Sequence, residues 1–155
     1  MLIALASGFG LGRIPAPGTA ASVVAWLIVQ PLVYFFPYAV VFGGALLFVV
    51  GIWSCKVYQE RWGVFDASEV VIDEIACVIL LSGLVHIYLT IEYSLFWQLC
   101  ALAFFRFYDI VKPLLIGTVD RRLHKMPLGT MLDDLLAAFA ALASVWAIFW
   151  AYHQI

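Results

Sequence analysis

Long apolar stretches separated by short polar connections limit what this chain can fold into. Each stretch has about the length of a membrane-spanning helix, and together they cover residues 20–36, 38–55, 75–91, 94–112 and 135–152. Hydrophobic residues make up 66% of the chain and charged residues only 12%. A soluble domain of 155 residues could not bury so much apolar surface. The sequence therefore predicts an all-α fold in one domain, a polytopic membrane helical bundle with about four to five membrane helices.

Basic residues indicate how such a bundle is oriented. If the apolar stretches cross the membrane alternately, all eight Lys and Arg residues fall on the same side. The positive-inside rule makes that side cytoplasmic. Nine of the ten acidic residues share it, so polar chemistry is expected at the cytoplasmic face. The net charge of −2 gives no reason to expect a nucleic acid partner. Pro31 leaves open whether the first stretch spans fully.

Carboxylates gather at the ends of the apolar stretches. Asp73 and Glu74 open the third stretch, Asp133 and Asp134 open the fifth, and Asp109 lies near the end of the fourth. The helix dipole alone favours acids in a first helical turn. Charges near lipid are costly, however, and all of these are expected at one membrane face. Hard oxygen ligands of this kind suit Mg²⁺. We therefore predict that the acids share a metal site.

Two basic residues accompany Asp109. Arg106, Asp109 and Lys112 are three residues apart, so a helix would place them on one stripe, where the basic groups could bind an anion next to a metal-binding acid. Snorkelling basic side chains with Asp109 as their counter-ion are the structural alternative. Thr19 follows a glycine- and proline-rich start, and it could cap a helix beginning near Ala20 or contact phosphate at its N-terminus.

These motifs, in this order, resemble the phosphatidylglycerophosphatase A family. The resemblance rests on Gly8-Phe9-Gly10, Pro17-Gly18-Thr19, Asp66, Val71-Ile72-Asp73-Glu74, Phe105-Arg106, Asp109, Lys112-Pro113, Asp120-Arg121 and Gly129-Thr130-Met131-Leu132-Asp133-Asp134. The family commonly has Trp before the Asp-Glu pair and Gly three residues after it, where this chain has Ile72 and Cys77. Such departures affect lipid fit and loop shape more than metal binding.

The resemblance implies an enzyme of the bacterial inner membrane that uses Mg²⁺ to convert phosphatidylglycerophosphate, an anionic membrane phospholipid, to phosphatidylglycerol. Its catalytic residues would be Arg106, Asp109, Lys112, Asp133 and Asp134. Its metal ligands would be Asp73, Glu74, Asp109, Asp133 and Asp134. Its phosphate contacts would be Thr19, Arg106 and Lys112. Asp66 is a weaker candidate, because it could simply shape a loop.

A small ion-coupled transporter or channel that uses the acids for ion passage is the alternative function. That class places charged residues through the membrane depth, whereas here they are expected at one face. A metal-polarised water is the expected nucleophile, and a phosphoaspartyl intermediate stays open. The sequence leaves undetermined the head-group selectivity, the number of metal ions and the oligomeric state.

Overall fold

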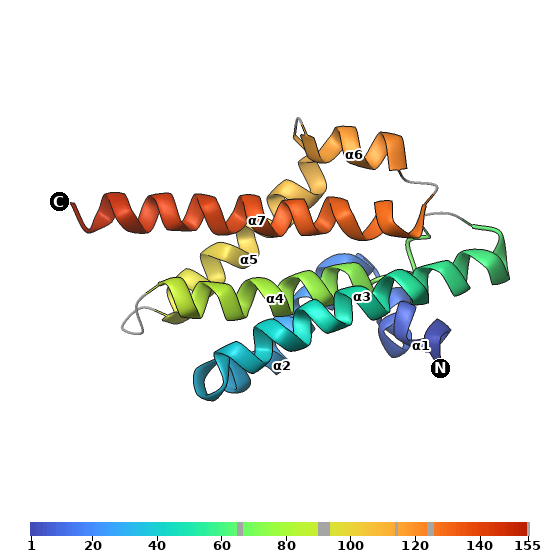
Figure 1. Ribbon diagram of the computed structural model, residues 1–155, viewed down its shortest axis with the longest axis horizontal. Helices are drawn as coiled ribbons and strands as arrows, with labels where there is room; N and C mark the ends of the chain where they lie inside the picture. The colour runs from blue at the N-terminus through green and yellow to red at the C-terminus, as the bar shows by residue number, and fades with distance from the viewer. Residues whose placement is uncertain (65–66, 90–93, 114, 124–125, 155) are drawn as a thin grey trace.

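The computed structural model describes residues 1–64, 67–89, 94–113, 115–123 and 126–154, and all regular structure in these ranges is helical. The predicted all-α fold is therefore confirmed. The elements are α1 (Leu2–Ala6), η1 (Gly8–Arg13), α2 (Pro17–Phe35), α3 (Pro37–Trp62), α4 (Ile72–Tyr88), α5 (Ser94–Val111), α6 (Leu115–Leu123) and α7 (Pro127–Tyr152). The two termini lie toward opposite ends of the long axis (Figure 1).

Helix α4 lies at the centre of the bundle and contacts α2, α3, α5 and α7. It runs beside α3, while α5 crosses obliquely to meet α7 (Figure 1). Glycines allow α3 and α4 to approach closely, because a Cβ on Gly44 would lie 2.7 Å from the backbone nitrogen of Leu80. Gly83 of α4 meets Val41 of α3 in the same way. Small residues at such crossings are typical of helices that pack within a membrane.

Three helices of the described chain, α2, α3 and α7, are long and apolar enough to cross a membrane. Helix α5 matches the predicted stretch 94–112 closely, whereas α4, with 17 residues, begins and ends three residues before the predicted stretch 75–91. The predicted number of four to five membrane helices is thus supported for three, and the crossing of α4 and α5 stays a prediction. Large apolar side chains such as Phe42 and Trp53 point outward, as expected where lipid is the solvent.

Helix α2 begins earlier than predicted. Its first residue is Pro17, because proline suits a first helical turn that needs no backbone donor. Thr19 consequently lies inside the helix, and the prediction that it caps a helix near Ala20 is wrong. The helix also continues through Pro31 to its end.

The helix ends near the acidic and basic site residues also differ from the predicted pattern. Helix α7 begins at Pro127, so Asp133 and Asp134 lie in its second turn, and the helix dipole does not explain them. Helix α5 ends before Lys112, whose φ of 46° is left-handed. The single stripe predicted from Arg106 to Lys112 is therefore wrong in its last member.

Candidate active site

A polar cavity of about 380 Å³ lies where α2, α4 and α7 begin and α5 ends. Every residue that the sequence singled out for metal or phosphate lines it: Thr19, Asp73, Glu74, Arg106, Asp109, Lys112, Asp133 and Asp134. Asp66 lies outside the described residues. Residues far apart in the chain thus meet in one place.

Three carboxylates form the core of this cavity. One oxygen from each of Asp73, Glu74 and Asp134 lies within 4.8 Å of the others. Asp73 is 7% exposed and Asp134 is 4% exposed. Within the described chain, Oε2 of Glu74 and Oδ2 of Asp134 are buried without a hydrogen-bond partner. Carboxylates held this close repel one another when ionised, and a cation bound between them would relieve that repulsion. Their donor set of hard oxygens fits Mg²⁺.

The remaining two acids pair with basic side chains. Nη1 of Arg106 lies 2.6 Å from Oδ2 of Asp109, and Nζ of Lys112 lies 2.6 Å from Oδ2 of Asp133. Asp133 is 5% exposed, so its pairing also offsets the cost of burial. The five predicted ligands are therefore of two kinds. Three form the carboxylate cluster, and the other two each form an ion pair with a basic side chain.

Arg106 connects three helices at the cavity wall. Besides its ion pair with Asp109 on its own helix, its Nη2 donates a hydrogen bond to Oγ1 of Thr19 at 3.2 Å. Its Nη1 donates to Oγ of Ser22 at 3.4 Å and lies 3.9 Å from Oε1 of Glu74. These contacts hold the planar guanidinium in one orientation. The guanidinium is thereby positioned to bind an anion in the cavity.

Two residues of α2 shape the site, and sequence reasoning missed these roles. Gly18 packs directly against the carboxylate of Glu74, since a Cβ there would collide with Oε1. Ser22 donates a hydrogen bond to the carbonyl of Gly18 at 2.8 Å while accepting one from Arg106. One signal was available: Ser22 lies three residues after Thr19, on the same face of an apolar helix.

The cavity carries a formal excess of negative charge. Its described lining holds five carboxylates and two basic side chains, an excess of three negative charges when all are ionised. A phosphate group would add further negative charge, which bound cations or protons on the acids would offset.

Comparisons with known proteins identify the family of this chain. The family model described as phosphatidylglycerophosphatase A matches residues 4–149. Phosphatidylglycerophosphatase A of Haemophilus influenzae is 36% identical over 93% of this chain and 86% of its own length. A Bacteroides thetaiotaomicron protein provisionally named phosphatidylinositol-3-phosphatase is 34% identical over 87% of this chain and 85% of its own length. No solved structure matches. The chain belongs to the phosphatidylglycerophosphatase A family.

Proposed function

We propose that this protein is a Mg²⁺-dependent lipid phosphatase that hydrolyses phosphatidylglycerophosphate to phosphatidylglycerol at the cytoplasmic face of the bacterial inner membrane. One observation carries the proposal: the buried cluster of Asp73, Glu74 and Asp134 shares a cavity with the fixed guanidinium of Arg106. A metal-binding group beside an anion-binding group suits phosphate transfer to water, because both stabilise negative charge that develops on the phosphate. Family membership supports the same reaction class.

Asp73, Glu74 and Asp134 would hold the metal. When bound there, Mg²⁺ supplies positive charge that stabilises negative charge developing on the phosphate oxygens. The chain's own contribution is to keep these carboxylates together before the ion arrives. The backbone helps, because the amide of Glu74 donates to Oδ1 of Asp73 at 3.0 Å. The amide of Val71 donates to the carbonyl of Ala6 at 2.9 Å and fixes the entry into α4.

Arg106 and Lys112 would bind the phosphate. The guanidinium can donate to two oxygens at once, and Thr19, Ser22 and Asp109 hold it in place for this. Lys112 is partly exposed at its side chain, 29%, so it lies where a head group would enter. In the reaction, a water oxygen forms a bond to the phosphorus of the terminal phosphate, and the phosphomonoester bond to the head-group glycerol breaks. The departing glycerol oxygen takes the proton that the water loses, and inorganic phosphate leaves.

The choice of lipid head group rests on the family model. The two relatives above bear names that refer to different lipid phosphates, and they are similarly close to this chain, at 36% and 34% identity. Both names describe removal of a phosphomonoester from a phospholipid. We propose phosphatidylglycerophosphate because the family model that spans residues 4–149 carries that description.

Phosphate release from the purified protein tests the proposal. We expect release from phosphatidylglycerophosphate with Mg²⁺, loss of release when the metal is chelated, and slower release from phosphatidylinositol-3-phosphate. No release from either lipid with metal present, combined with ion flux in protein-loaded vesicles, would instead establish the transporter. Faster phosphate release from the inositol lipid would support phosphatase activity but show that phosphatidylinositol-3-phosphate is the preferred substrate.

The cytoplasmic orientation needs a separate measurement. In a variant without the native cysteines, Arg122→Cys on α6 should react with a membrane-impermeant thiol reagent only when the cytoplasmic side is accessible. This position is exposed and lies among the basic residues that predict the orientation. Labelling of this cysteine from the periplasmic side would refute the cytoplasmic orientation.

A further inference from the structure

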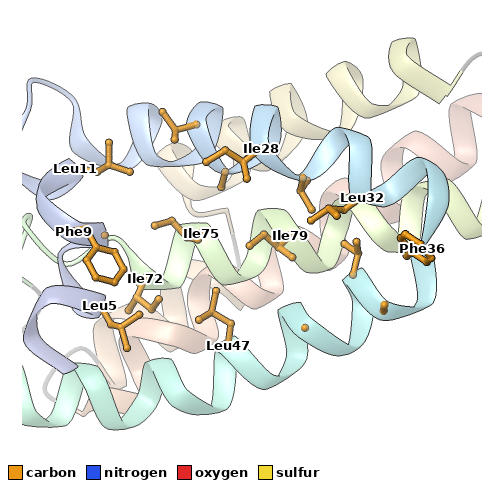
Figure 2. Close-up of a pocket in the computed structure, with 17 residues that line it drawn as sticks. Leu5, Phe9, Leu11, Ile28, Leu32, Phe36, Leu47, Ile72, Ile75 and Ile79 are labelled. Carbon is orange, nitrogen blue, oxygen red and sulfur yellow. The ribbon is translucent and has the colours of Figure 1, made fainter. Parts of the chain in front are cut away.

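A second cavity, apolar and larger than the polar one, lies on the other side of α4. Its volume is about 660 Å³, within the range of small-molecule sites. Figure 2 shows Ile72, Ile75 and Ile79 of α4 between α2 and α3, with the α1–η1 segment at one end. All of its lining residues are apolar, so no hydrogen bond from a ligand could be satisfied by a side chain there.

The cavity is an open groove rather than a closed void. Ile28 on its edge is 67% exposed, whereas Val29 and Val40 deeper in are 3% and 6% exposed. Along α2 the lining extends from Val24 to Phe36, which at 1.5 Å per helical residue is about 18 Å. One leaflet of a bilayer's hydrocarbon core is about 15 Å thick. Along α2 alone, the groove is therefore at least as long as one leaflet's hydrocarbon core is thick.

The groove begins beside the acid cluster. Ile72 and Ile75 line the groove, while Asp73 and Glu74, between them in sequence, line the polar cavity. Successive residues on a helix point in different directions, so one turn of α4 serves both cavities. A phosphate in the polar cavity and a tail in the groove would be joined over a short distance around the start of α4. In phosphatidylglycerophosphate, the head-group glycerol and a phosphodiester connect the terminal phosphate to the glycerol that carries the acyl chains, so one molecule carries both chemistries.

We propose that the groove binds one acyl chain of the lipid substrate and that α3 determines how long a chain it accepts. This inference rests on the proposed function, because the chain would belong to the same lipid phosphate. Ala39, Gly43 and Leu47 line the groove at intervals of four residues and form one stripe of α3. A Cβ on Gly43 would meet no atom within 4 Å, so the absence of a side chain there leaves the groove open halfway along.

When an acyl chain enters the groove, it moves from lipid hydrocarbon to protein hydrocarbon. Its binding free energy therefore comes from packing rather than from the hydrophobic effect. Blocking the groove should therefore alter chain-length preference more than overall binding. Gly43→Phe places a ring in the groove without a strained backbone, and Gly43→Leu is the milder version. Ala45→Phe is the matched control. It adds the same ring to an exposed position of the same helix, about 200° away around the axis.

The first measurement compares kcat/KM for palmitoyl and octanoyl forms of phosphatidylglycerophosphate in one detergent. Gly43→Phe should lower the ratio of long-chain to short-chain kcat/KM about tenfold, and Gly43→Leu less. Ala45→Phe should keep the wild-type ratio within about twofold. An unchanged ratio of long-chain to short-chain kcat/KM in both Gly43 variants would overturn the proposed acyl-chain site but not the proposed phosphatase activity.

The second measurement is independent of turnover. A lipid phosphate with a photoreactive group at the end of one acyl chain should label the groove-lining residues of α2 and α3 in the full-length protein. Gly43→Phe should reduce that labelling about fivefold or more relative to Ala45→Phe. Labelling spread evenly over the outward faces of α2, α3 and α7 would contradict the proposal. So would a change of oligomeric mass in Gly43→Phe with unaltered labelling, because a second copy would then occupy the groove.

Discussion

Nζ of Lys112 lies 2.6 Å from Oδ2 of Asp133, which ties the end of α5 to the second turn of α7. Lys112 adopts a left-handed backbone with a φ of 46°. This conformation costs a non-glycine residue about 1 kcal/mol or more. The turn directs the ammonium group into the polar cavity, beside a carboxylate that is 5% exposed. The strained backbone position thus lies at the candidate site.

Lys112→Asn tests the role of this pair. Asparagine tolerates the left-handed backbone but carries no charge, so the local fold should persist. We expect kcat/KM for the lipid phosphate to fall about tenfold to a hundredfold, because a phosphate contact is lost. A double-mutant cycle with Asp133→Asn should show a coupling of about 0.5–3 kcal/mol in unfolding free energy. Additive effects in the cycle would mean that the two side chains act separately.

Asp134→Asn should separate function from stability. The substitution keeps the shape of a residue that is 4% exposed but removes one charge from the acid cluster. Phosphate release should fall by at least about a hundredfold, and Mg²⁺ should no longer raise the unfolding temperature. Without metal, the variant should unfold at the same or a higher temperature than the wild type, because repulsion among buried carboxylates decreases.

Glu60→Gln is the control for this charge removal. Glu60 pairs with Lys56 at 3.9 Å, and both side chains are more than 60% exposed. An exposed pair contributes little to stability. Activity and the effect of Mg²⁺ should therefore match the wild type. Wild-type turnover in Asp134→Asn would show that Asp134 is not a required metal ligand.

Two glycines should respond differently to the same substitution. In Gly18→Ala the new Cβ would collide with the carboxylate of Glu74, so activity and Mg²⁺ binding should fall about tenfold or more. In Gly44→Ala the Cβ would lie 2.7 Å from the backbone nitrogen of Leu80. That contact cannot relax easily and should cost about 1–3 kcal/mol of stability. Activity per folded molecule should be retained in Gly44→Ala. Thermal unfolding and metal titration of both variants distinguish the two effects.

The main helices and the gathering of acids could be predicted because each depends on local information. Apolar runs of this length specify helices in lipid, and the basic residues place Asp73 and Asp133 on one side of the membrane. Short elements such as α1, η1 and α6 were not predicted, since they have too few residues for a clear hydrophobic period.

The contacts that complete the site depend on how helices cross, which the sequence does not encode locally. Ser22 bonds to the carbonyl of Gly18 four residues earlier, a common arrangement in any helix. Its second bond, to Arg106, exists because α5 crosses α2 at that level. Likewise, the pairing of Lys112 with Asp133 depends on where α7 passes. Spacing along α5 alone placed Lys112 with Arg106 instead.

Arg106→Lys tests whether a fixed guanidinium, rather than positive charge alone, is required. Lysine would keep the charge near Asp109, but one ammonium cannot also reach Thr19 and Ser22 as the two Nη atoms do. We expect kcat/KM to fall about a hundredfold or more.

Ser22→Ala provides the comparison, because it removes one support of Arg106 and leaves the guanidinium in place. It should reduce kcat/KM by roughly threefold to tenfold, the range of an ordinary hydrogen bond, because this one is long at 3.4 Å. In the Arg106→Lys background the same change should have little further effect, since lysine no longer uses that support. Arg61→Lys, at an exposed position near the end of α3, should behave as wild type. Equal activity of Arg106→Lys and wild type would show that charge suffices and that the contacts of Arg106 serve only to join α2 to α5.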